Sequence, residues 1–371
     1  MSYQYSKETI FSLLKKLCST ISVSGHEDEI RGLIIDELKP FADELWVDSL
    51  GNVIATKKGT RNAGRFMIAA HMDEIGLMVT HVDDRGFLRF TPIGGWSERI
   101  LPAQRVLIKS LDGKKIIRGV IGSKPPHVMK PEEAKQVIPI NNLFIDIGVN
   151  SREEAEKLGI GPGSIVVLDR DVVRLGNPNI VSGRAFDDRV GVVTMIEAFK
   201  ALDNHEVDVY AVATVQEEVG LKGARVAAFA IEPHVALAID VTVASDIPGV
   251  EEHEQITKVG RGPAIKIMDG RRGSGLIAHP AVRELLIRVA KEEKIPYQLE
   301  ILTGGTTDAS IIQLNKEGVP AGTISIPTRY IHSPVEVLSL ADVENAIKLT
   351  IGFTKRLTSE WIKENLRRKI K

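Results

Sequence analysis

The sequence contains a single cysteine, Cys18, among its 371 residues. One cysteine excludes an intramolecular disulfide, and it also excludes a metal site built from several thiolates of one chain. Any metal ion that this protein binds must therefore be held by histidine and carboxylate side chains.

Aromatic residues and long apolar runs are scarce as well. Aromatic side chains make up 5% of the chain, which argues against a sugar-binding site, because such sites favour stacked aromatic rings. No apolar run approaches the roughly 18 residues that a membrane span needs, and the first 16 residues have no apolar core of signal-peptide length. We therefore expect a cytoplasmic protein that does not bind membranes.

The chain has no marked excess of either charge. Its 48 lysines and arginines face 49 aspartates and glutamates, for a formal net charge of -1. This balance gives no indication of binding to nucleic acid or to an anionic membrane. Residues 367–371 are locally basic, and we interpret them as a solvated helix end, because the helix dipole favours cations there.

The composition offers ample material for a core, with 43% apolar and 26% charged residues. Because 371 residues are many for one hydrophobic core, we expect two domains. Alternating helix and strand patterns in residues 1–75 and 176–371 predict two parts of one α/β domain, a mixed open sheet flanked by helices on both faces. Residues 76–175 show short strand patterns between Gly, Pro and Asp turns, which predicts an inserted small β domain.

Local patterns predict several individual elements. Ser24 and Glu27 have the spacing of a capping box, ahead of a helix with apolar residues at helical spacing up to residue 38. Residues 65–70 are typical of a buried strand that ends at His71. The Gly- and Arg-rich residues 260–275 favour a loop.

Two adjacent carboxylates, Glu217 and Glu218, follow the apolar stretch 207–215. Successive side chains of an extended chain point to opposite sides, and the backbone begins to turn where a strand ends. One carboxylate of such a pair can therefore bind a metal while the other faces a substrate.

Four more candidate ligands lie near the ends of strand patterns or at the start of a helix. They are His71, Asp187, Asp240 and His332. In open α/β sheets, ligands gather at the carboxyl ends of strands. Together with Glu218, two imidazoles and three carboxylates suit a pair of divalent Zn or Co ions if one carboxylate bridges them, and we assign the bridge to Asp187.

Several of these side chains also have a purely structural interpretation. Asp187 and Asp240 could be caps, and the Glu217 pair could be a solvated turn. Asp73, two residues after His71, is spaced to lie behind the imidazole and fix its tautomer. Asp308 could position a substrate amine or cap a helix over residues 309–314. We interpret His81 as structural.

Five motifs resemble those of the tetrahedral (TET) dinuclear aminopeptidases, including the archaeal deblocking and leucyl types. They occur in the family's order and span nearly the whole chain. The motifs are AAHMDEIG at 69–76, DDR at 187–189, VQEEVG at 215–220, AIDVT at 238–242 and YIHS at 330–333. This resemblance implies one metal held by His71, Asp187 and Asp240, and a second held by Asp187, Glu218 and His332.

The resemblance also implies an activity and an assembly. It implies that an ion-activated water attacks the first peptide bond of a short peptide, while Glu217 takes its proton and passes it to the leaving amine. It implies a PDZ-like dimerisation domain for the inserted segment, with dimers assembled into a hollow tetrahedral dodecamer. Twelve chains of 40.6 kDa would form a particle of about 490 kDa.

The loop at residues 304–310, GGTTDAS, is similar to the family's glycine-rich substrate loop. This similarity makes Gly305, Thr306 and Asp308 candidates for the substrate pocket. Thr306 and Ser310 depart from the leucyl-type pattern. From the resemblance alone we expect a preference for neutral, aliphatic N-terminal residues.

Other functions stay open on the sequence alone. A deacylase or a carboxypeptidase would use the same di-metal core. A glucanase would use paired carboxylates but would give the two histidines no role. A non-catalytic binding protein on an inactivated scaffold would lack a ligand or the base, and none is missing here. Blocking the N-terminus of the peptide separates an aminopeptidase from the first two alternatives.

Overall fold

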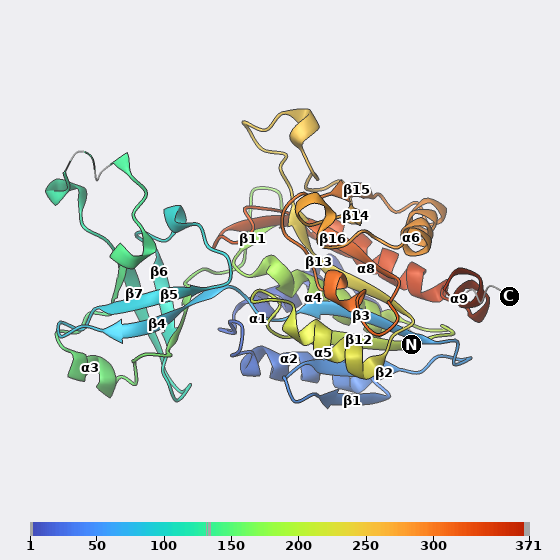
Figure 1. The fold of residues 1–371 in the computed structure, drawn as a ribbon, viewed down its shortest axis with the longest axis horizontal. Coiled ribbons are helices and arrows are strands. Elements are labelled where there is room, and N and C mark those ends of the chain that lie inside the picture. Colours follow the sequence, from blue (N-terminus) through green and yellow to red (C-terminus); the bar gives the residue numbers. More distant parts are fainter. Residues whose placement is uncertain (1–2, 131, 133–134, 367–371) are drawn as a thin grey trace.

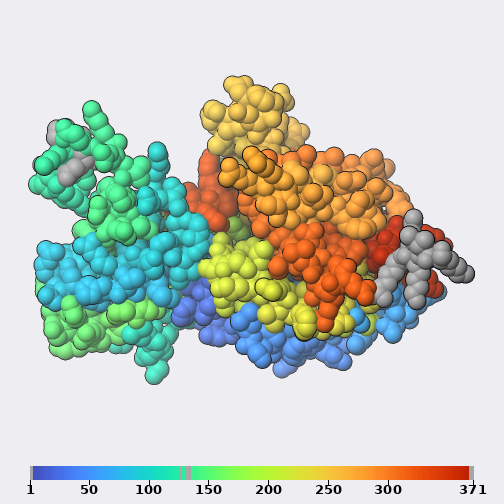
Figure 2. Space-filling model, in the orientation of Figure 1, coloured from blue at the N-terminus to red at the C-terminus, as the bar shows by residue number. Residues whose placement is uncertain are grey.

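The computed structural model describes residues 3–130, 132 and 135–366. Figure 1 shows a larger α/β lobe and a smaller β lobe made from the middle of the chain, and the space-filling view in Figure 2 shows the same two lobes. The basic residues 367–371, interpreted above as a helix end, lie outside the described residues. Within the described ranges, no helix combines the length and apolar character needed to cross a membrane.

An eleven-stranded mixed sheet forms the larger lobe, with the order β1-β2-β12-β3-β13-β16-β17-β11-β10 along its main path. The central strands β12, β3, β13 and β16 are parallel, and β14 and β15 extend the sheet beside β16. The bounds are β1 (Glu44–Val47), β2 (Val53–Lys57), β3 (Arg65–His71), β10 (Val173–Arg174), β11 (Ile180–Gly183), β12 (Asp208–Thr214), β13 (Val235–Val243), β14 (Ala264–Met268), β15 (Gln298–Ile301), β16 (Ala321–Arg329) and β17 (Glu336–Ser339).

Helices cover both faces of this sheet, as the sequence predicts. In β3, Phe66 and Ile68 point into the larger core, whereas Met67 and Ala69 point into the core on the opposite face. The larger core is covered by α1 (Lys7–Cys18), α2 (Asp28–Leu38), α4 (Phe186–Ala201), α6 (Pro280–Glu292) and α8 (Leu340–Lys355). The opposite face packs against α5 (Lys222–Ile231) and α7 (Ala309–Ile312), and α9 (Ser359–Asn365) adds Trp361 to the larger core.

The smaller lobe is a closed barrel with the strand order β4-β5-β8-β7-β6-β9. The strands are β4 (Gly76–Val82), β5 (Leu88–Ile93), β6 (Arg105–Lys109), β7 (Ile116–Gly122), β8 (Phe144–Asp146) and β9 (Ile165–Leu168), with α3 (Arg152–Lys157) beside them. The fold class, an α/β sheet with a separate small β domain, is therefore confirmed. The predicted domain boundaries at residues 75 and 175 stay predictions. Strand β10 lies before residue 175, yet it pairs with β11 of the large sheet.

Two local predictions were wrong. The capping box is absent, because Glu27 makes no side-chain cap for α2 and the Ser24 hydroxyl donates instead to Asp73 Oδ2 at 2.6 Å. The predicted loop at 260–275 contains β14, because β15 and β16 supply backbone partners that its local composition does not reveal. Helices α1 and α5 were not predicted.

Candidate metal centre

The register of the parallel strands brings His71 and Asp240 to the same level. Ala69 of β3 pairs with Ala238 of β13. His71 and Asp240 each lie two positions further along these strands, so both follow on the same face of the sheet. Thr214 is the partner of His71 on the other side, at the end of β12. The polar residues thus replace the apolar ones where the strands reach the edge of the core.

The other three predicted ligands come from turns around this edge. Asp187 stands at the start of α4, but its backbone (φ -73°, ψ 110°) is not helical. Ala185 holds the cap position of α4, so the interpretation of Asp187 as a cap is wrong. Asp240, the other residue interpreted above as a possible cap, lies inside β13. Glu218 follows β12, and His332 follows β16.

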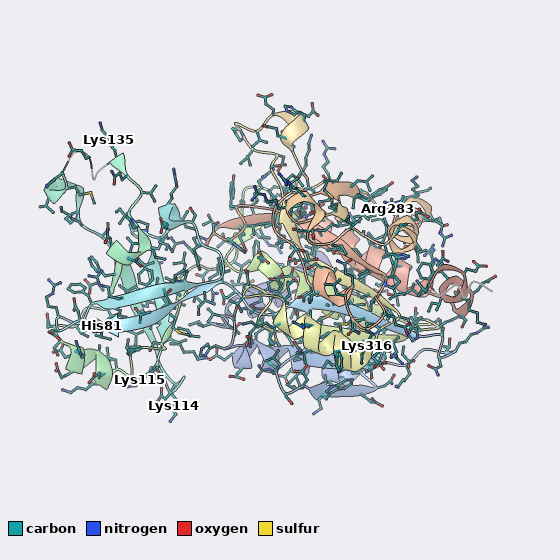
Figure 3. The ribbon with its side chains drawn as sticks, in the orientation of Figure 1. His81, Lys114, Lys115, Lys135, Arg283 and Lys316 are labelled. Atoms are coloured by element: carbon teal, nitrogen blue, oxygen red, sulfur yellow. The ribbon has the colours of Figure 1, made fainter. Side chains whose placement is uncertain are left out.

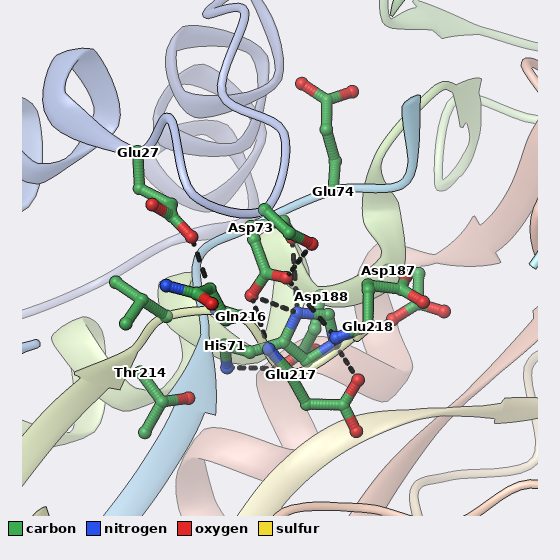
Figure 4. A network of polar contacts seen from close by, with 12 residues as sticks. Glu27, His71, Asp73, Glu74, Asp187, Asp188, Thr214, Gln216, Glu217 and Glu218 are labelled. Carbon is green, nitrogen blue, oxygen red and sulfur yellow. Dashed lines mark hydrogen bonds and ion pairs between the residues drawn. The ribbon is translucent and has the colours of Figure 1, made fainter. Parts of the chain in front are cut away.

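The structure brings all five predicted ligands together in two groups that share Asp187 (Figure 4 shows part of this network). Within each group the candidate ligand atoms lie within 4.8 Å of one another. His71 Nε2 is 3.1 Å from Asp187 Oδ1, and His332 Nε2 is 3.3 Å from Asp187 Oδ2. The two oxygens of Asp187 therefore face different imidazoles, which is the arrangement that a bridging carboxylate needs. The groups are completed by Asp240 and by Glu218.

These donors fit a pair of divalent cations. Two atoms that each lie about 2.1 Å from one tetrahedral ion are about 3.4 Å apart. The contacts of His332 Nε2 with Asp187 Oδ2 and with Glu218 Oε1, both 3.3 Å, are close to that spacing. Glu218 Oε1 is also buried and forms no hydrogen bond, so a cation at this position would compensate its charge.

The electrostatics of the site favour positive charge. Burial lowers the pKa of His332, but the ion pairs with Asp187 and Glu218 outweigh burial and raise this pKa to about 11. Burial raises the pKa of Asp187, yet the hydrogen bonds to His332 and His71 hold it well below its usual range. Asp187 is therefore an anion that is available to a metal ion.

Asp73 is fully buried, and its carboxylate Oδ1, which was predicted to fix the His71 tautomer, is 3.5 Å from His71 Nδ1. Its backbone carbonyl oxygen lies 3.2 Å from His71 Nδ1. Because a carbonyl only accepts, this contact favours a proton on Nδ1, so Nε2 is the nitrogen that could bind a metal ion. The Asp73 carboxylate also accepts the backbone N–H of Glu217 at 3.0 Å and of Glu218 at 3.3 Å (Figure 4). Asp73 thus holds two parts of the site at once.

Glu217 lies beside the first ligand group, with its Oε2 3.9 Å from His71 Nε2. Its side chain is 10% exposed, so the pair is not a solvated turn. Burial raises the pKa of Glu217 well above its usual range, and the carboxylates of Asp240 and Asp308 raise it further against the lowering effect of His71. A carboxylate with a raised pKa is a good proton acceptor near neutral pH.

Glu336 is a supporting residue that the sequence did not reveal. It is buried in β17, and its carboxylate accepts the backbone N–H of Phe186 at 2.6 Å and of His332 at 3.0 Å. One carboxylate thereby positions the turns that carry Asp187 and His332. The signal that was available is its place four residues after His332.

Ser24 is a second such residue, because its hydroxyl donates to Asp73 Oδ2. We expect Ser24→Ala to weaken metal binding or lower activity about tenfold, since supporting hydrogen bonds behind a ligand typically contribute a factor of about 10 to 100. A chelator titration of activity measures the change. Ser19→Ala, which removes an exposed hydroxyl bonded to Lys16, is the control. An unchanged titration of Ser24→Ala would refute this supporting role.

The three predicted pocket residues have different surroundings. Gly305 and Thr306 line a surface hollow, whereas Asp308 is buried. Asp308 makes no side-chain cap for α7, so that interpretation is wrong. Asp308 Oδ2 accepts a 2.6 Å hydrogen bond from the Thr214 hydroxyl, and Asp308 Oδ1 has no partner among the described residues. Burial raises the pKa of Asp308 to about 6.

His81 belongs to neither ligand group. It lies on β4 of the barrel lobe and is exposed there (Figure 3). His81 therefore lies outside the candidate site, and its interpretation as a structural residue stays a prediction.

The chain is similar in sequence and in fold to known aminopeptidases. The family model described as M42 glutamyl aminopeptidase matches residues 51–349. The structure is similar to that of the aminopeptidase APDkam598 from Desulfurococcus kamchatkensis, with a TM-score of 0.95, 55% identity, and coverage of 98% of this chain and 99% of that chain. The TET1 peptidase of Pyrococcus horikoshii, described as able to assemble into a tetrahedron or a large octahedral shell, is similar with a TM-score of 0.82, 38% identity, and coverage of 94% and 99%. A lysyl aminopeptidase of Pyrococcus furiosus is 42% identical over 94% of this chain and 97% of its own length.

Proposed function

Because the chain belongs to the peptidase M42 family of metal-dependent aminopeptidases, we propose that its two ligand groups hold two divalent ions and that Glu217 is its general base and acid. The observation that carries this proposal is the position of Asp187, whose two oxygens face His71 and His332 separately. Imidazole and carboxylate ligands suit both Zn and Co. The substrates would be short peptides that lose their N-terminal residue.

The residues of the chain divide the work of hydrolysis. Bound divalent ions would polarise the scissile carbonyl group and make the attacking water more acidic. Glu217 would accept the proton of that water and return it to the leaving amine. Its backbone N–H donates to Asp73 Oδ1 at 3.0 Å, which fixes the turn from which the Glu217 side chain extends. General acid and base catalysis of this kind contributes a factor of about 10² to 10⁴.

The acidic surroundings of the site would select the N-terminal end of a peptide. A free α-ammonium group is attracted by carboxylates, and the unpartnered Oδ1 of Asp308 adds negative charge behind Glu217. An amine held in this way would place the first peptide bond next to the ions. Such binding would account for the removal of one residue at a time.

The preferred first residue and the assembly are finer parts of the proposal. We propose neutral, aliphatic N-terminal residues, although the names of the relatives include a lysyl aminopeptidase and the family model is described as glutamyl. We also propose that the barrel lobe mediates dimers and that these assemble into a dodecamer. The tetrahedral assembly described for the Pyrococcus horikoshii TET1 peptidase supports this proposal.

The experiment that tests the function compares free and N-acetylated peptides as substrates. We expect the protein to release the first residue of the free peptide alone, to lose this activity with a chelator, and to regain it with Zn or Co. Chelated protein without added metal is the control. Equal cleavage of the acetylated peptide would favour the deacylase or carboxypeptidase alternative, and activity that ignores the chelator would refute the di-metal proposal.

A further inference from the structure

A surface hollow of about 530 Å³ lies beside the turn that carries Glu217. Its walls come from the start of α5, the turn after β14 and the loop before α7. The Leu221 backbone N–H in one wall donates to the Glu217 carbonyl at 2.9 Å, so this wall continues directly from the proposed catalytic turn. The lining residues include Leu221, Arg271, Gly275, Gly305, Thr306 and Gln313.

The turn that carries Arg271 is fixed against the substrate loop. Asp269 is fully buried, and its Oδ1 accepts the Leu276 backbone N–H at 2.5 Å and the Thr306 hydroxyl at 2.9 Å. Gly275 leaves room for this contact, since a Cβ there would lie 2.2 Å from Asp269 Oδ1. The two walls are therefore held together by a buried carboxylate, and the turn has a defined position.

Arg271 is the one charged residue among the described residues that line the hollow. Within the described ranges its side chain makes no hydrogen bond or ion pair. The nearby carboxylates of Asp269 and Glu300 already face the buried Lys266, whose Nζ is 3.4 Å from Asp269 Oδ2 and 3.0 Å from Glu300 Oε1. Arg271 is exposed, so its guanidinium group is solvated at the mouth of the hollow and is free to bind an anion.

We propose that Arg271 is a specificity-determining residue that binds a carboxylate of the peptide substrate in this hollow. A guanidinium group offers its donors in a planar fork that matches a carboxylate. A short peptide with a neutral first residue brings two kinds of carboxylate, its C-terminal group and an acidic side chain at a later position. The inference rests on the aminopeptidase function proposed above, because that function places a peptide next to Glu217.

The test measures kcat and KM for two matched pairs of peptides. The first pair is Leu-Ala-Ala with a free or an amidated C-terminus, and the second is Leu-Glu-Ala-amide against Leu-Gln-Ala-amide, so that the first residue is aliphatic in all four peptides. In one of the two pairs we expect the KM of wild-type protein to be about tenfold lower for the peptide with the carboxylate than for its uncharged partner. A charge-assisted hydrogen bond would give a difference of this size. Arg271→Gln should abolish this preference through KM with kcat little changed, because the interaction is made equally in the ground and transition states. The pair that shows the preference identifies the carboxylate.

Two further variants keep the test specific. Arg272→Gln removes the adjacent exposed arginine, which is not among the lining residues, and should keep the wild-type preference. Arg271→Glu should reverse the preference towards the uncharged member of the pair. Equal KM values for both members of both pairs in wild-type protein, or a preference that survives in Arg271→Gln, overturn the assignment. Wild-type protein that releases no residue from any of these peptides overturns the proposed function, and this inference with it.

Discussion

Replacement of Glu217 by glutamine is expected to lower kcat about a thousandfold or more while the protein still binds its metal. Glutamine keeps the shape of the side chain but cannot take up and return a proton, and that transfer contributes a factor of about 10² to 10⁴. The variant should also fold, because residue 217 keeps its backbone N–H and can still donate it to the Asp73 carboxylate. Release of the first residue from a free peptide gives kcat, and elemental analysis of the dialysed protein gives the metal content.

The neighbouring carboxylate supplies the matched control. Glu218→Gln removes a proposed ligand of the second group, so it should lower the metal content as well as the activity. The two substitutions are chemically identical and adjacent in the chain, and only their positions in the site differ. A Glu217→Gln variant that retains more than about a tenth of wild-type kcat would contradict the assignment of the base.

Replacement of Asp187 by alanine is expected to remove both metal ions and to abolish activity. Asp187 is the residue that the two ligand groups share, and its oxygens lie 3.1 Å from His71 Nε2 and 3.3 Å from His332 Nε2. Each group would lose the ligand that it shares with the other, and two ligands would be left in each group to bind an ion. Metal titration of the chelated protein measures the stoichiometry.

His332→Ala is the control for this prediction, because it changes the second group alone. It should keep about one tightly bound ion per chain, held by the intact first group. If Asp187→Ala bound one ion with wild-type affinity, Asp187 would belong to a single group and would not bridge.

The central strands could be predicted from the sequence because both faces of the sheet are covered. Residues 66–70 and 235–239 are buried throughout, so they form continuous apolar runs that local patterns reveal. The prediction failed where partners distant in the chain decide the structure. Ser24 bonds Asp73 rather than a helix end, and β14 forms because β15 and β16 flank it.

The candidate site divides in the same way. The residue types and their places at strand ends indicated five candidate ligands, and the structure brings these side chains together, while their binding of metal stays a prediction. The supporting residues were missed because they act through contacts between distant parts of the chain: Glu336 bonds the backbone of Phe186 across 150 positions, and Ser24 bonds Asp73 across 49. Contacts of this kind depend on how turns from different elements pack.

By itself, the sequence determined the chemistry that is available to this protein. A single cysteine leaves histidine and carboxylate as ligands, and the apolar runs place them at the ends of buried strands. Only the tertiary structure decided that Asp187 faces both imidazoles, that Asp73 holds His71 together with the Glu217 turn, and that Arg271 lies unpaired in a hollow. The physical reason is that these arrangements are distances between atoms far apart in the chain. Strand register and the packing of turns set such distances. The order of residues sets only the chemical properties of each side chain, such as its charge and its ability to bind a metal or a proton.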